Sequence, residues 1–151
     1  MFQYIACGLS NVWLANGYIQ EGTGDLKLSQ INDLPALHRL IGTLLINRRG
    51  CLVSAEMRFL RQEMNLSRRS LGDKLGVEPA FINQWERHNA RLPRIADVLL
   101  RVLYAGIRLK DCETELSIHL LSDEENEPCA ERMIFRWDAT GWQRDGAHRP
   151  G

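Results

Sequence analysis

The chain has 151 residues and a mass of 17.3 kDa, and its 44% hydrophobic and 25% charged residues are typical of a globular protein with one domain or a small domain with appendages. The formal net charge is zero, but residues 51–110 carry eleven basic and six acidic side chains, whereas residues 111–151 carry four basic and ten acidic ones. This separation of charge predicts an anionic partner for the middle of the chain.

Membrane insertion, secretion and metal binding are not expected. No apolar run approaches the roughly 20 residues that span a bilayer, and the first residues lack the basic segment that opens a secretory signal. A structural zinc site normally needs close pairs of ligands, but the cysteines are far apart, at Cys7, Cys51, Cys112 and Cys129. We therefore expect a cytoplasmic protein with reduced thiols and with no metal or other cofactor.

Residues 1–50 are predicted to form a small module of β-strands and one helix. Asn16-Gly17, a dipeptide favoured in tight hairpins, stands between two short stretches with strand-like composition. Over residues 34–46 apolar side chains recur at helical spacing, and either Asn32 or Asp33 is suited to cap this helix. The expected order is thus a hairpin followed by a helix.

Residues 51–110 are predicted to form three short helices and a longer one. Ser54 and Ser67 are the expected N-caps of the first two helices, and Gly76 ends the second. The side chains expected on the buried faces are Met57, Leu60 and Met64 in the first helix, Ile82 and Trp85 in the third, and Ile95, Val98, Leu99, Val102 and Leu103 in the last. Short helices around a glycine-containing turn, followed by a supporting helix, are the arrangement of a helix-turn-helix unit.

Residues 111–151 are predicted to form an acidic tail with a possible hairpin. An acidic, proline-ended spacer at residues 123–128 is followed by an alternating pattern at residues 133–137 and a turn. An isolated hairpin is marginally stable in water, so this one must pack on the body of the protein or on a partner. Trp137 and Trp142 are accordingly either a partner-binding anchor or part of the local packing.

The stretch LSRRSLGDKLGVEPAFINQWERHNARLP, at residues 66–93, resembles the lambda-repressor-like (Xre-type) helix-turn-helix family. The matching elements, which cover under half of the chain, are Leu66-Ser67, Leu71-Gly72, Leu75-Gly76-Val77, Ile82 with Trp85-Glu86, and Arg91-Leu92-Pro93. Two positions depart from the family, which usually has Gln in place of Arg68 and Ala in place of Gly72. The resemblance implies a mainly α protein whose residues 51–110 form a dimeric helix-turn-helix domain that binds double-stranded DNA.

The third helix of such a unit enters the major groove, so its outward side chains are the candidate base readers. Gln84 is suited to a two-pronged bond with adenine, Ala80 and Phe81 are suited to thymine methyl groups, and Asn83 to either a base or a phosphate. The predicted phosphate contacts are Ser67, together with the start of the second helix, and Arg68, Arg69, Arg87, Arg91 and Arg94. The alternative interpretation is a solvated basic face on an ordinary helical bundle.

The N-terminal segment carries a second resemblance. The sequence YIACGLSNVWLANGY, followed by a helix and a helix-turn-helix, is similar to antitoxins of the MqsA type and their relatives without zinc fingers. The zinc-binding cysteine pairs of MqsA are absent, since this region contains only Cys7. The resemblance implies a toxin-binding module before a DNA-binding one. On the other interpretation, four of its side chains simply pack on the helix at residues 34–46, namely Tyr4, Val12, Trp13 and Leu14.

No enzyme activity is expected. The sequence has no nucleophile elbow, phosphate-binding loop or H-E-x-x-H motif, and its histidines are isolated, at His38, His88, His119 and His148. The expected function is a homodimeric, sequence-specific repressor of a palindromic operator, and further the autoregulating antitoxin of a toxin encoded by a neighbouring gene. Leu100 and Tyr104 are the expected dimer contacts. The alternatives are a phage or mobile-element regulator without a toxin, and a protein-interaction adaptor that has lost DNA binding.

Overall fold

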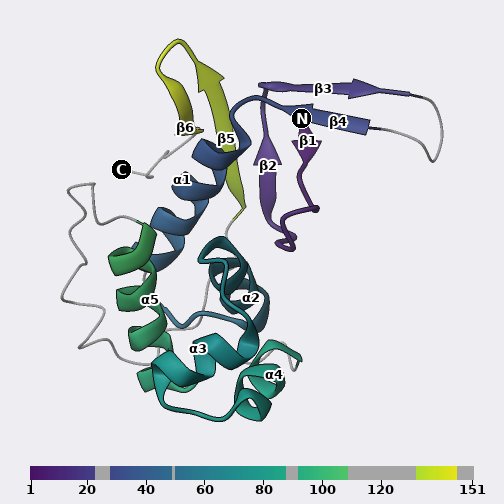
Figure 1. Cartoon of the computed structure of the whole chain (residues 1–151). Coiled ribbons are helices and arrows are strands. Elements are labelled where there is room, and N and C mark those ends of the chain that lie inside the picture. Colours follow the sequence, from purple (N-terminus) through teal and green to yellow (C-terminus); the bar gives the residue numbers. More distant parts are fainter. Residues whose placement is uncertain (23–27, 49, 88–91, 109–131, 146–151) are drawn as a thin grey trace. The chain divides into compact units, whose positions relative to one another are not determined.

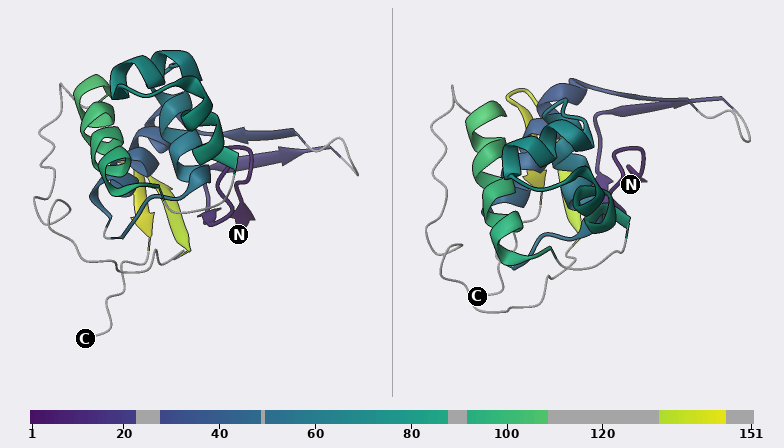
Figure 2. Two further views of the ribbon diagram at one scale, coloured as in Figure 1. Left: turned by 90° about the horizontal axis from the view of Figure 1, so that it is seen from below. Right: turned by 60° about the horizontal axis from the view of Figure 1, so that its bottom comes forward.

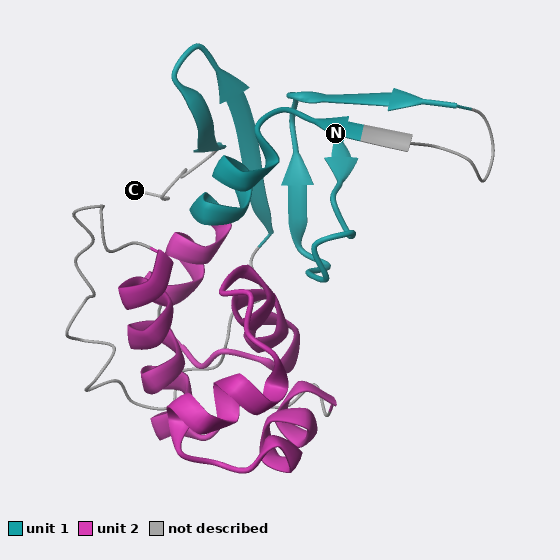
Figure 3. Ribbon diagram, in the orientation of Figure 1, with its two compact units in different colours: residues 1–40, 130–151 teal, residues 41–129 magenta. Residues whose placement is uncertain are grey.

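The computed structural model describes residues 1–22, 28–48, 50–87, 92–108 and 132–145 (Figure 1). They form two compact units, which are coloured separately in Figure 3. Unit 1 comprises residues 1–40 and 130–151, and unit 2 comprises residues 41–129. The strands are β1 (Phe2–Gln3), β2 (Val12–Leu14), β3 (Tyr18–Glu21), β4 (Leu28–Ile31), β5 (Met133–Asp138) and β6 (Gly141–Asp145). The helices are α1 (Leu34–Asn47), α2 (Ser54–Glu63), α3 (Arg68–Leu75), α4 (Pro79–Arg87) and α5 (Arg94–Arg108).

The fold is mixed, with helices predominating and a small sheet. The two units divide the chain at other positions than the predicted segments 1–50, 51–110 and 111–151, because β5 and β6 fold together with the first strands. None of the described helices combines the length and the apolar character that crossing a membrane requires.

The sheet of unit 1 joins strands from both ends of the chain in the order β1-β2-β5-β6 (Figure 1). Strands β5 and β6 form the predicted hairpin, with Trp137 opposite Trp142. Strand β5 also pairs in parallel with β2, placing Leu14 opposite Phe135. The hairpin therefore packs on the first strands of the chain within unit 1. Trp142 is mostly buried and donates its indole N–H to the carbonyl of Asn32 at 2.6 Å.

The hairpin predicted at Asn16-Gly17 is wrong. Strands β2 and β3 on either side of it belong to different sheets, since β3 pairs with β4 instead. The Asn16 side chain bonds the main chain of Trp137, accepting from its N–H at 2.6 Å and donating to its carbonyl at 2.9 Å. Gly17 has a φ of 77°, and a Cβ there would lie 2.6 Å from the Trp142 ring. Asn16 thus extends the contact of β2 with β5, and the positive φ of Gly17 lets the chain leave the four-stranded sheet.

Unit 2 contains the end of α1, from residue 41, and helices α2 to α5, with α4 against α2 and α3, and α5 also against α2 and α3 (Figure 2). The expected buried residues Met57, Leu60, Met64 and Ile82 are confirmed, whereas Trp85 is only half-buried. Ser67 is confirmed as the cap of α3, because its hydroxyl accepts the Ser70 N–H at 3.0 Å. The predicted cap at Ser54 is wrong.

Helix α2 is capped one residue earlier than expected. Its N-cap is Val53, whose N–H donates to the Glu56 carboxylate at 3.0 Å, while Ser54 is buried inside the first turn. Helix α3 ends as predicted, since Gly76 adopts a left-handed φ of 74°.

Gly72 is explained by the close approach of the chain that follows α3. A Cβ at this position would lie 2.6 Å from the main-chain carbonyl oxygen of Val77. We therefore expect Gly72→Ala to lower the free energy of unfolding by about 1–3 kcal/mol, despite the better helix propensity of alanine. Urea denaturation would measure the change. Gly106→Ala is the matched control, because a Cβ there meets no atom of the chain within 4 Å. Equal effects of the two substitutions, at a protein concentration where the chain is monomeric, would contradict the steric explanation.

The predicted inner face of α5 is wrong. Ile95, Leu99 and Val102 are 73%, 41% and 50% exposed. The buried residues are instead Ala96, Asp97, Leu100, Arg101 and Tyr104. The expected dimer contacts Leu100 and Tyr104 are therefore inside unit 2, and a Cβ at Gly42 would lie only 2.0 Å from the Tyr104 hydroxyl.

An ion pair accounts for this orientation of α5. The Arg101 guanidinium bonds Asp97 at 2.5 Å and donates to the carbonyls of Arg48 at 2.7 Å and Gly50 at 2.6 Å. Asp97 in turn accepts the N–H of Leu52 at 2.7 Å. The main-chain groups of the segment between α1 and α2 thus find their hydrogen-bond partners in side chains of α5. These bonds require Asp97 and Arg101 to face the interior of unit 2.

Candidate nucleic-acid interface

Helix α4 exposes the side chains that the sequence assigns to base reading. Ala80, Phe81 and Gln84 are exposed, while Asn83 is half-buried. Their orientation follows from the buried Ile82 and Glu86 on the opposite side of the helix. Phe81 is 49% exposed, and its ring lies 6.1 Å from that of Trp85. The exposed face of α4 therefore offers an aromatic ring, a small apolar group and an amide.

The predicted phosphate contacts lie at the ends of neighbouring helices. Ser67, Arg68 and Arg69 are exposed at the start of α3, Arg87 is exposed at the end of α4, and Arg94 opens α5. The Ser67 hydroxyl bonds Ser70 within its own helix. Arg91 and His88 lie outside the described residues. All the described candidates thus belong to unit 2. In the sequence, they lie before α4, within it and directly after it.

Glu86 is a buried carboxylate that sequence reasoning did not assign to the site. It is 2% exposed and accepts two bonds from Arg61, from Nε at 2.8 Å and from Nη2 at 3.0 Å. Arg58 and Arg68 place their Nε atoms 3.7 Å and 3.6 Å from the same carboxylate. Because Glu86 follows Ile82 by four residues, helical spacing alone puts it on the buried face of α4.

The Glu86 carboxylate also orients charges that face solvent. The side chains of Arg58 and Arg68 remain 44% and 47% exposed although both lie beside Glu86. Arg58 additionally donates to the Glu86 carbonyl at 2.8 Å, at the end of α4. Three arginines around one carboxylate leave an excess of positive charge, and two of them remain partly exposed to solvent. A polyanion is the ligand that such a surface favours.

Acidic groups lie close to this surface as well. Glu78 is exposed directly before α4, and Asp73 is exposed on α3 beside Lys74. Carboxylates at these positions repel phosphates, whereas the neighbouring arginines attract them. Glu78 is also suited to accept a hydrogen bond from a cytosine amino group, and it is not among the site residues predicted from the sequence.

The described residues also include side chains of the types that bind metal ions. No group of three or more His, Cys, Asp or Glu side chains in this part of the chain is placed to hold a metal ion. Cys7 is buried and Cys51 half-buried, while Cys112 and Cys129 lie outside the described residues.

The pKa of Asp138, in the turn between β5 and β6, is lowered. The hydrogen bond from the Thr140 side chain contributes most, followed by the bond from the Thr140 main chain.

Comparison of the chain with family models, with curated proteins and with solved structures found no match.

Proposed function

We propose that the protein is a homodimeric, sequence-specific DNA-binding repressor that acts in the cytoplasm and controls its own operon as the antitoxin of a neighbouring toxin gene. The observation that carries the DNA-binding part is the exposed face of α4, where Ala80, Phe81 and Gln84 stand opposite the buried Ile82 and Glu86. A helix that presents small, aromatic and amide side chains between arginines is suited to the major groove. The antitoxin part of the proposal rests on unit 1. Because the candidate DNA-binding residues all lie in unit 2, a second compact unit indicates a second task, such as binding a toxin.

The outward face of α5 supports the proposal of a dimer. Between Arg94 and Arg108 the polar side chains of this helix are Asp97, Arg101 and Tyr104, all of them buried. The exposed positions in between are apolar: Ile95, Leu99, Val102 and Gly106. They follow one another at intervals of four, three and four residues, the spacing of a seam between two helices. We therefore place the dimer contact on these residues instead of on Leu100 and Tyr104.

A two-fold dimer fits the proposed ligand. Two copies joined through α5 would present two α4 helices to half-sites about 34–36 Å apart on one face of a palindromic operator.

Replacing Gln84 with alanine tests the reading face. Gln84→Ala is expected to weaken binding to the operator by about 1–3 kcal/mol and to relax one base preference, because a two-pronged bond is lost. Arg68→Ala is expected to weaken binding to every sequence and to reduce the salt slope by about one unit. Fluorescence anisotropy with the DNA upstream of the protein's own gene and with random DNA, at several salt concentrations, would measure both.

The control for this experiment is Gln62→Ala, which removes the same side chain from an exposed position on α2 and is expected to leave the affinity unchanged. Equal losses on operator and random DNA for Gln84→Ala would refute its role as a base reader. Absence of salt-dependent binding by the wild-type protein would refute the DNA-binding function and favour an adaptor.

A further inference from the structure

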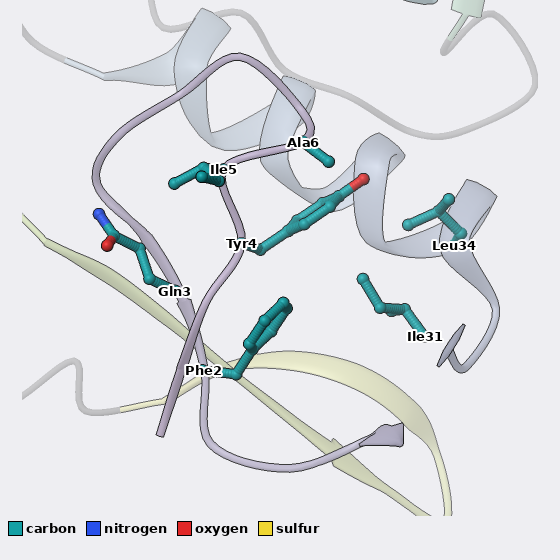
Figure 4. Close-up of a pocket in the computed structure, with 7 residues that line it drawn as sticks. All are labelled: Phe2, Gln3, Tyr4, Ile5, Ala6, Ile31 and Leu34. Carbon is teal, nitrogen blue, oxygen red and sulfur yellow. The ribbon is translucent and has the colours of Figure 1, made fainter. Parts of the chain in front are cut away.

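Unit 1 contains a pocket beside its first strand (Figure 4). The pocket has a volume of about 390 Å³ and lies between residues 2–6 on one side and Ile31 and Leu34 on the other. This volume is at the lower end of the roughly 300–1,000 Å³ that is usual for ligand pockets. In Figure 4 the rings of Phe2 and Tyr4 and the side chains of Ile31 and Leu34 border the same space.

The walls of this pocket are uncharged and mostly apolar, and hydrogen bonds hold them in place. None of the residues that line it is charged. The Tyr4 hydroxyl bonds His38 Nε2 at 2.8 Å, so the polar end of that ring is satisfied within unit 1. The Tyr4 carbonyl accepts the Cys7 thiol at 3.3 Å, and Gln3 donates to the Ser10 carbonyl at 2.7 Å. These bonds hold the segment before β2 in place, which reduces the entropy that a ligand must overcome.

Aliphatic side chains at the pocket remain open to solvent. Ile5 is 65% exposed and Leu34 is 36% exposed. Both line the pocket, and Met1, next to Phe2, is 66% exposed. Covering such side chains with an apolar group is favourable, whereas a charged group would lose its hydration here without gaining a partner.

The main chain beside the pocket offers hydrogen bonds to an extended ligand. Strand β1 is the outermost strand at its end of the sheet. The Tyr4 N–H donates to the Val12 carbonyl across the pair at 2.9 Å. Because main-chain groups of an antiparallel strand alternate in direction, those of Gln3 point away from β2. An outer strand with groups so directed is a template on which another extended chain can pair.

We propose that this pocket binds an extended, uncharged segment of a partner protein, which inserts one aliphatic or aromatic side chain between Phe2, Ile31 and Leu34 and pairs its main chain with the outer edge of β1. An uncharged segment is favoured because the lining offers no charged partner. A peptide is favoured over a small apolar molecule because the edge of β1 can form hydrogen bonds with its main chain. The site lies wholly within unit 1 and does not depend on DNA binding.

The probe for the test is a library of random twelve-residue peptides displayed on phage and selected against the full-length protein. We expect enriched peptides in which apolar and polar residues alternate, with no charged residue at the central apolar position. Leu34→Glu is expected to weaken binding of a selected peptide about ten- to a hundredfold, because the charge faces the inserted side chain. Methylation of alternate main-chain nitrogens of that peptide is expected to weaken binding as well, since it removes donors to β1.

Leu34→Glu should fold, because Leu34 opens α1, whose first turn has no acidic residue, and a carboxylate is favourable at a helix N-terminus. The matched control is Ile19→Glu, at a 54% exposed isoleucine on β3 that does not line the pocket, and it should leave peptide binding unchanged. Circular dichroism would verify the fold of both variants. Peptides that bind Leu34→Glu as tightly as wild type, or no enrichment at all, would overturn the proposal. An oligomer of the wild-type protein that Leu34→Glu dissociates and Ile19→Glu does not would also overturn it, by assigning the pocket to a second copy.

Discussion

Replacing Arg101 with methionine is expected to lower the free energy of unfolding by about 3–5 kcal/mol, because it leaves the buried Asp97 carboxylate without its cationic partner. Arg101 is 4% exposed and Asp97 is 5% exposed, so water cannot take the place of the lost guanidinium. The substitution also removes the donor to the carbonyls of Arg48 and Gly50. Methionine keeps most of the length of the side chain, so the loss reports on charge and hydrogen bonds more than on packing.

Urea denaturation followed by circular dichroism would measure this effect. Arg69→Met is the matched control, because Arg69 is exposed on α3 and its replacement is expected to change the free energy of unfolding by less than about 0.5 kcal/mol. Adding Asp97→Leu to Arg101→Met should restore part of the stability, since the unpaired charge is then gone. If the single Arg101 variant is as stable as the Arg69 variant, the ion pair does not hold the segment between α1 and α2 in place.

The same ion pair shows why part of the fold could not be predicted from the sequence. The helix at residues 94–108 was predicted almost to its ends, because a run of helix-forming residues is a local signal. Its orientation was not, because a hydrophobic pattern counts Asp97 and Arg101 as outward-facing. The two side chains neutralise each other, but the main-chain groups that hydrogen-bond them inside unit 2 come from residues 46–52, about fifty positions away in the chain. No local pattern contains that contact.

The strands illustrate the same limit. The pairing of β5 with β6 was predictable, since a hairpin joins neighbouring residues through a short turn. The parallel pairing of β2 with β5 joins residues more than a hundred positions apart, and nothing in either strand specifies the other. The composition of Asn16-Gly17 therefore favours a local hairpin, although the Asn16 side-chain amide bonds Trp137 of β5.

The candidate base-reading face was largely predictable because it lies on one short helix, α4. Once Ile82 is placed inside, helical geometry directs Ala80, Phe81 and Gln84 outward, as the structure shows. The contact of Arg68 with Glu86 was not predicted, because it joins two helices. Arg68 therefore serves the packing of unit 2 as well as the proposed phosphate contact.

The exposed apolar face of α5 leads to the second large effect that we expect. Leu99→Glu should raise the dissociation constant of the dimer at least about a hundredfold, because two-fold symmetry places the substitution on both sides of the contact. Each carboxylate would lose hydration in an apolar seam and would face the same charge on the partner. Since Leu99 is 41% exposed in the single chain, the fold of unit 2 should tolerate the change. Sedimentation equilibrium over a range of protein concentrations would measure the dissociation constant, with Ile19→Glu in unit 1 as the control.

A substitution of Gly106, on the same face, is expected to change the stability of the dimer and the stability of the single chain in opposite directions. A glycine inside a helix costs up to about 1 kcal/mol relative to alanine. Gly42 and Gly72 are each explained by a close contact in unit 2, but a Cβ at Gly106 would meet no atom within 4 Å. Close approach of a second helix would explain the glycine. Gly106→Ala should therefore raise the stability of the chain and yet weaken the dimer. A wild-type protein that is monomeric at the concentrations where it binds its operator, or a Gly106→Ala variant that dimerises as tightly as wild type, would show that α5 does not pair with itself through this face.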